Sequence, residues 1–177
     1  AGAPAGAAIH PASGAFTWTP SEAQGPGSHP ITVRVTDNGV PAKSAERSFT
    51  VTVNEVNRAP VLPVIAAQQN ASEGQLFSLN AAAADADLPA NPLTYALGAG
   101  APAGLSLNAA TGLIAWTPDE TQGGQSFPVT VNVTDNGTPA LGDSRSFTVN
   151  VAEVNTAPAL TAIPDAPVDE GGELSFT

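Results

Sequence analysis

Two carboxylates separated by one residue, Asp85 and Asp87, are the clearest candidates for chemistry in this sequence. On an extended segment, side chains two positions apart point to the same face, so both carboxylates can converge on one point. Two like charges held that close repel each other unless a cation neutralises them. The pair therefore predicts a cation site. The competing interpretation is a solvated turn, because Asp also favours turns.

Catalytic chemistry has little support in the rest of the sequence. The absence of Cys excludes thiolate catalysis, disulfides and Cys-ligated metals. No motif of a Ser–His–Asp set accompanies His10 or His29, and His29 lies at an inward strand position that predicts a structural imidazole. Asp119 and Glu120 are adjacent, which does not place them across a sugar ring as a glycosidase pair would be. We therefore expect a protein that is not an enzyme.

Composition and charge exclude several classes of partner. The 177 residues carry a net charge of −11 with only five Lys and Arg. An acidic surface repels phosphate backbones, so we expect no nucleic-acid partner. No apolar run reaches the roughly 18–20 residues of a membrane span, so we expect no membrane insertion in this segment. A hydrophobic content of 42% is too high for a disordered acidic chain.

The sequence repeats itself with an offset of 98 residues. Trp-Thr-Pro at residues 18–20 returns at 116–118, and Thr-Asp-Asn-Gly at 36–39 returns at 134–137. Arg-Ser-Phe-Thr-Val at 47–51 and Glu-Val-Asn at 55–57 return at 145–149 and 153–155. A fixed period of this kind is typical of tandem modules.

The repeat divides the chain into three parts. Residues 58–155 are expected to form one complete module, residues 1–57 the C-terminal part of a preceding module, and residues 156–177 the N-terminal strands of a further one. An incomplete module cannot easily bury a core of its own, and the sequence contains no Met. We therefore expect a slice of a longer tandem array.

Alternation of apolar and polar residues predicts strands, most clearly at residues 127–134 and 147–151. The Asp-Asn-Gly run at 135–137 predicts a turn after the first of them. Five further candidate strands are residues 61–65, 75–80, 93–97, 105–107 and 113–116. Seven short strands in about 98 residues predict an all-β fold of tandem Greek-key β-sandwich modules. Trp18 and Trp116 are expected to anchor the cores, the alternative being a platform for stacking sugars.

Several motifs together resemble the bacterial cadherin-like and "Putative Ig" repeats of large secreted or surface proteins. They are Ala-Gly-Leu-Ser-Leu at 103–107, Ala-Thr-Gly-Leu-Ile at 110–114, Trp-Thr-Pro at 116–118, Val-Thr-Asp-Asn-Gly at 133–137 and Glu-Val-Asn-Thr-Ala-Pro at 153–158. With their copies they cover almost the whole chain. The resemblance implies Ig/cadherin-like sandwiches, an extracellular or cell-surface location and a structural or adhesive role.

The resemblance also implies calcium at the junctions between modules, bound by six to eight oxygen atoms. Asp85 and Asp87 are similar to the family's Asp-x-Asp pair, Asp135 to its strand-end Asp, and Asn91 offers a nearby oxygen. The other members of the expected ligand set come from the linker, the preceding module and the opening strand; they are Glu55, Asn57, Glu22 and Glu73.

The linker departs from the family pattern. It is one residue shorter, and its central Asp is replaced by Arg58 in one copy and by Thr156 in the other. A cationic Arg58 opposes a second calcium ion, so we expect fewer ions per junction than in animal cadherins.

The sequence thus predicts a structural or adhesive extracellular repeat, stiffened at its junctions by calcium. Its partners would be neighbouring modules of the same chain, other copies of itself, or cell-surface proteins and glycans. One alternative is a fibre subunit that assembles by strand exchange of its incomplete end modules. The other is a carbohydrate-binding accessory module.

Overall fold

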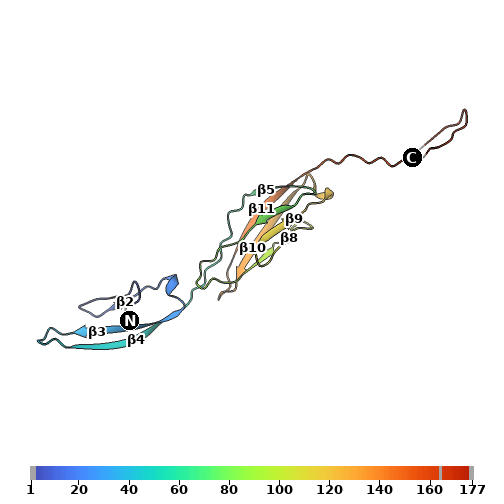
Figure 1. The fold of residues 1–177 in the computed structure, drawn as a ribbon. Coiled ribbons are helices and arrows are strands. Elements are labelled where there is room, and N and C mark those ends of the chain that lie inside the picture. The colour runs from blue at the N-terminus through green and yellow to red at the C-terminus, as the bar shows by residue number, and fades with distance from the viewer. Residues whose placement is uncertain (1–2, 164, 176–177) are drawn as a thin grey trace.

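The protein is an elongated chain of β-structure in which two folded parts follow one another and are joined by a short linker (Figure 1). The computed structural model describes residues 3–163 and 165–175. The first part contains a small sheet of β1 (Ala8–Ile9) and β2 (Phe16–Thr17), a 3-10 turn η1 (Glu22–Gln24), and a long antiparallel hairpin of β3 (Gly27–Thr36) and β4 (Ser44–Val53). Its inward positions are only partly covered, since Phe49 and Ile9 are 42% and 45% exposed.

The second part is a complete sandwich of two sheets. One sheet has the strand order β5 (Gln68–Ser72), β11 (Gly142–Ala152), β10 (Ser126–Asp135) and β7 (Leu93–Leu97). The other has the order β6 (Phe77–Asn80), β9 (Leu113–Trp116) and β8 (Ser106–Leu107). A second 3-10 turn, η2 (Glu120–Gln122), precedes β10. The expected all-β sandwich is confirmed.

The alternating residues of the strands build the core of this sandwich. Along β10, Val129, Val131 and Val133 are almost fully buried, while the residues between them are polar. The opposite sheet contributes Ile114 and Trp116, which are 0% and 1% exposed. The Trp116 indole donates a hydrogen bond to the Ala103 carbonyl (3.1 Å). Trp116 is therefore a core anchor, and a sugar-stacking role for it is excluded by its burial.

The equivalent tryptophan of the first part repeats this geometry with a different neighbour. The ring of Trp116 meets Phe127 edge to face at 5.2 Å, and that of Trp18 meets His29 in the same way at 5.0 Å. The His29 Nε2 atom lies 2.7 Å from the Gln24 carbonyl oxygen. As expected, the imidazole at position 29 has a structural role; it takes the place that the phenyl ring of Phe127 has in the second part.

Most predicted strands form where they were expected, and one was misplaced. Residues 93–97 and 113–116 are β7 and β9, with the predicted bounds. The candidate at 61–65 is wrong, because Val61 makes only an isolated bridge to Ala84. Pro63 has no N–H for a ladder, which disfavours a strand there. The first strand of the sandwich is instead β5, which pairs in parallel with β11.

Residues 156–163 and 165–175 contain no strand and are exposed. Their assignment to the opening strands of a further module stays a prediction. None of the helical segments among the described residues has the length and apolar character needed to cross a membrane.

A partly buried contact joins the beginning of the second part to its last strand. The backbone N–H of Leu62, a residue only 2% exposed, donates to Oδ2 of Asp143 (3.0 Å). Arg145 adds an ion pair to Oδ1 of the same carboxylate (3.0 Å). The hydrogen bond from Leu62, helped by Ser144 and Arg145, lowers the pKa of Asp143 below its usual value, although desolvation opposes it.

We expect Asp143→Asn to lower the free energy of unfolding by about 1–2 kcal/mol at pH 7, since Asn is a weaker acceptor for the Leu62 N–H. A carboxylate whose pKa is depressed on folding stabilises above its unfolded pKa and loses that effect as the pH falls through the folded value. The difference from wild type should therefore shrink below pH 3.8. Urea unfolding between pH 3 and 7 measures it. The exposed Asp169→Asn serves as control, and a pH-independent difference would contradict the prediction.

Candidate functional site

The linker between the two parts is tied to the second part through Asn57. Its Nδ2 atom donates to both oxygens of Asp135 (3.2 and 3.1 Å) and to the Pro139 carbonyl (2.8 Å). Its Oδ1 atom accepts a hydrogen bond from Asn91 (2.7 Å). Gly137 lies so close that a Cβ there would overlap the Asn57 side chain. These contacts fix where the linker leaves the sandwich.

Asp135, at the end of β10, is the carboxylate that accepts the hydrogen bonds from Asn57. It is 5% exposed and also accepts hydrogen bonds from the backbone N–H groups of Gly137 (3.0 Å) and Leu141 (2.9 Å). Desolvation raises its pKa, but the hydrogen bonds from Leu141, Gly137 and Asn57 outweigh it and lower the pKa overall. Asp135 is therefore held as a carboxylate by two backbone donors of its own module and by Asn57 of the linker.

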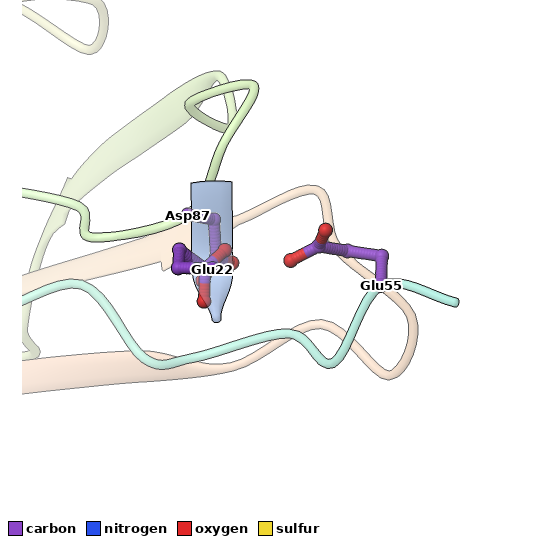
Figure 2. Close-up of side chains that lie close together, drawn as sticks. All are labelled: Glu22, Glu55 and Asp87. Atoms are coloured by element: carbon purple, nitrogen blue, oxygen red, sulfur yellow. The ribbon is translucent and has the colours of Figure 1, made fainter. Parts of the chain in front are cut away.

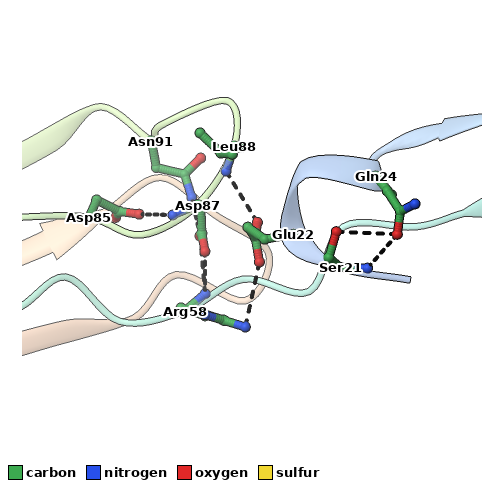
Figure 3. A network of polar contacts seen from close by, with 8 residues as sticks. All are labelled: Ser21, Glu22, Gln24, Arg58, Asp85, Asp87, Leu88 and Asn91. Carbon is green, nitrogen blue, oxygen red and sulfur yellow. Dashed lines mark hydrogen bonds and ion pairs between the residues drawn. The ribbon is translucent and has the colours of Figure 1, made fainter. Parts of the chain in front are cut away.

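Asp87 is a second anchor for the linker and is 1% exposed. Both of its oxygens accept from the Arg58 backbone N–H (3.2 and 3.1 Å), and Oδ2 also accepts from Asn91 (2.9 Å). Asp85 turns its Oδ1 atom back to the Asp87 N–H (2.9 Å). Its Oδ2 atom is buried and has no hydrogen-bond partner among the described residues. Figure 3 shows this network beside the 3-10 turn of the first part.

Three carboxylates from three segments converge at this junction (Figure 2). Glu22 comes from η1 of the first part, Glu55 from the linker and Asp87 from the loop after β6. One carboxylate oxygen of each lies within 4.8 Å of the others. Glu22 also accepts a hydrogen bond from the Leu88 N–H (3.2 Å). We call this group the first carboxylate cluster; it brings acidic groups from both sides of the linker together.

One cationic side chain borders the first carboxylate cluster. An Arg58 guanidinium nitrogen lies 3.6 Å from Oε2 of Glu22 (Figure 3). The pKa of Glu55 is nevertheless raised, first by desolvation and then by the charges of Glu22 and Asp87 and a hydrogen bond shared with Glu22. The cluster therefore retains an unbalanced negative charge.

A second carboxylate cluster lies at the far end of the sandwich and consists of Glu73, Glu120 and Glu153, again within 4.8 Å. Glu120 and Glu153 are the copies of Glu22 and Glu55. Glu73 is 5% exposed, and its Oε1 accepts from the Val154 N–H (3.0 Å). Its Oε2 is buried and has no hydrogen-bond partner within residues 3–163 and 165–175. The charge of Glu73, followed by desolvation and the charge of Glu120, raises the pKa of Glu153. Gly123 leaves the space for these side chains, since a Cβ there would overlap Glu73 and Glu153.

The structure divides the predicted ligand set among three places. Glu22, Glu55 and Asp87 meet in the first carboxylate cluster, with Asp85 hydrogen-bonded to its edge. Asn57, Asn91 and Asp135 form the adjoining hydrogen-bonded network, and Glu73 belongs to the other end of the sandwich. Glu120 and Glu153 are not among the predicted ligands, although their offset of 98 residues from Glu22 and Glu55 was the signal that could have added them.

The acidic pair considered for glycosidase chemistry is divided between two other roles. Asp119 caps η2, accepting from the Thr121 N–H (2.9 Å). Glu120 faces Glu73 and Glu153 instead.

Both clusters suit a hard cation such as calcium. Their donor atoms are carboxylate oxygens, which calcium prefers. Each cluster is accompanied by a buried carboxylate oxygen, Asp85 Oδ2 or Glu73 Oε2, that has no hydrogen-bond partner in the part of the chain that the structure describes. Buried oxygens of this kind are costly to leave unpaired. Bound calcium would supply the positive charge that these oxygens lack.

Solved structures of similar fold include cadherin extracellular domains. The extracellular domain of protocadherin GammaB4 is similar with a TM-score of 0.60 and 26% identity, over 86% of this chain and 27% of that one. Mouse cadherin-23 EC22-24 is similar with a TM-score of 0.55 and 20% identity, over 84% of this chain and 50% of that one. This similarity shows a shared fold.

Sequence comparison finds a curated relative and a family model that match this chain. A chitinase A of Pseudoalteromonas piscicida is 33% identical over 128 residues, which are 71% of this chain but only 15% of the chitinase. Residues 1–54 and 59–152 match the family described as "Putative Ig domain", and together they make up most of the chain. The protein therefore belongs to the "Putative Ig domain" family, with a cadherin-like β-sandwich fold.

Proposed function

We propose that this chain is a structural or adhesive segment of an extracellular tandem array, and that bound calcium stiffens its module junctions. The family, the cadherin-like fold and the end-to-end arrangement of the two parts support this role (Figure 1). Its direct partners are then the neighbouring modules of the same polypeptide.

The observation that carries the proposal is that the residues of the first carboxylate cluster come from both parts of the chain and from the linker. Glu22 belongs to the first part, Asp87 to the second and Glu55 to the linker between them (Figure 2). Without a cation, like charges at this separation repel and oppose the approach of the two parts. With calcium bound, the same carboxylates attract a common charge and hold the parts in one relative orientation.

The hydrogen bonds of the junction prepare this arrangement. The Leu88 N–H holds Glu22, while Asn57 and the Arg58 N–H fix the linker on the second part. The Glu22 and Asp87 carboxylates therefore lose little freedom when they bind a cation, which favours affinity.

The test is a calcium titration by calorimetry. We expect a dissociation constant of roughly 10⁻⁴–10⁻³ M, as in extracellular calcium modules. At a free concentration ten times Kd, one site adds about 1.4 kcal/mol to the free energy of unfolding. Glu55→Gln should remove the contribution of the first cluster, whereas Glu46→Gln on β4, far from both clusters, should leave it unchanged.

The same samples should be measured by small-angle scattering. The maximum dimension of wild type should fall, or its profile become less rod-like, when calcium is chelated. Absence of titration heat together with an unchanged scattering profile would contradict the proposal.

A second candidate is an accessory segment of a carbohydrate-active enzyme, which the similarity to part of a chitinase A favours. It has weaker support, because Trp116, the aromatic ring expected to stack on a sugar, is buried in the core.

A further inference from the structure

Arg58 connects both sides of the first junction through two different groups. Its backbone N–H donates to Asp87 of the second part (3.2 and 3.1 Å). Its guanidinium lies 3.6 Å from Glu22 of the first part. The side chain is 61% exposed, so it is held at the rim of the cluster and is not packed in the core (Figure 3).

The copy of this position has no such charge. Residue 156, at the same offset as the other repeated residues, is Thr. Of the ion pairs formed by residues 3–163 and 165–175, none involves Glu73, Glu120 or Glu153. Two clusters with corresponding Glu residues therefore differ in whether the chain itself provides a positive charge.

We propose that the Arg58 guanidinium is a built-in counter-ion at the first junction. It supplies part of the positive charge there, whereas a junction with a neutral residue at this position must take all of that charge from bound cations. Glu22, Glu55, Asp85 and Asp87 bring four negative charges to the first junction, and Arg58 balances one of them. The inference rests on the proposed function for its calcium affinity. Its effect on alignment in the absence of calcium is independent of that function.

The charge of Arg58 has two consequences, since it lowers the calcium affinity of the cluster but favours the alignment of the two parts. Arg58 repels an incoming cation and so weakens calcium binding at the cluster. It also attracts Glu22 toward the second part, and so keeps the junction aligned when calcium is scarce. The first junction should therefore be less calcium-dependent than it would be with Thr or Gln at position 58.

The test compares Arg58→Gln with Arg34→Gln. Gln keeps the length and backbone N–H of residue 58 but removes the charge. Arg34 is a matched control, because it forms a similar exposed pair with Glu46 (3.8 Å, 63% exposed) on the β3–β4 hairpin. By calorimetry we expect Arg58→Gln to bind calcium about two- to fivefold more tightly than wild type. Arg34→Gln should be unchanged, since salt screens charges beyond about 8 Å.

Alignment is measured in chelator by the distance between two spin labels. The chain has no Cys, so Ala45→Cys on β4 and Ala110→Cys before β9, both exposed, give one label in each part. The distance distribution should be broader for Arg58→Gln than for wild type and Arg34→Gln, and calcium should narrow it again.

The outcomes separate the two proposals. If wild type binds calcium but Arg58→Gln matches Arg34→Gln in affinity and in distance distribution, the counter-ion inference is overturned and the proposed function stands. If wild type binds no calcium but Arg58→Gln alone broadens the distribution in chelator, the calcium proposal fails and the counter-ion is supported.

Discussion

Replacing Trp116 by alanine is expected to lower the free energy of unfolding of the sandwich by about 3–5 kcal/mol. The side chain is 1% exposed and is the largest of the fully buried residues. Its removal leaves a cavity between the two sheets, loses the edge-to-face contact with Phe127 and leaves the Ala103 carbonyl without the indole donor. Urea unfolding followed by far-UV circular dichroism measures the loss without depending on tryptophan fluorescence.

Trp18→Ala is the matched control for this prediction. The Trp18 indole makes the same kind of hydrogen bond, to the Ala5 carbonyl (3.1 Å), but its ring is only partly buried. We expect a cost below about 2 kcal/mol, because less apolar area is lost and water can fill the space. A cost for Trp116→Ala as small as the one expected for Trp18→Ala would show that the sandwich core does not depend on Trp116.

Gly137→Ala is expected to release the linker from the second part, at a cost of about 3 kcal/mol. The added Cβ would occupy the position of the Asn57 side chain. Asn57 must then move away from Asp135, Pro139 and Asn91, which leaves the buried Asp135 with fewer donors. We expect lower stability in urea and a broader distance distribution between labels at residues 45 and 110.

Gly39→Ala tests whether this effect comes from the linker contact. Gly39 is the copy of Gly137, and the nearest atoms to a Cβ there would be Asp37 Oδ1 at 3.3 Å and the Pro41 carbonyl oxygen at 3.7 Å. Its cost should be small, and the label distances should not change. A Gly137→Ala protein with the wild-type distance distribution would mean that Asn57 does not determine the junction geometry.

Local sequence patterns were sufficient to predict the strands whose own residues alternate or form a compact apolar run. The alternation along β10 and β11 and the compact apolar runs of β7 and β9 gave these elements from the sequence. β5 was missed because Gln68–Ser72 is polar and has no alternation of its own. Its position depends on parallel pairing with β11, about 80 residues away in the sequence, and such long-range pairing is not visible in a local window.

The site was predictable where the repeat could be used and less so elsewhere. The offset and the family resemblance brought Glu22, Glu55 and Asp87 together in one prediction, and the structure places them within 4.8 Å. The Asn57–Asp135 contact joins residues 78 positions apart, and which acceptor an amide selects depends on the folded geometry. For the same reason the ion pair of Arg58 with Glu22 could not be derived from residue types alone.

The parallel pairing of β5 and β11 determines how the sandwich responds to mechanical force. The first and last strands of the module lie side by side, with Gln68 opposite Thr148 and Ser72 opposite Ala152. Because they are parallel, tension on the two ends of the module pulls these strands past each other along their length. The ladder between them is then loaded in shear, with its hydrogen bonds sharing the load, whereas a hairpin pulled open at its ends loses its bonds one at a time. Resistance to pulling is a property of the unfolding rate, so this arrangement prolongs the lifetime of a stretched module.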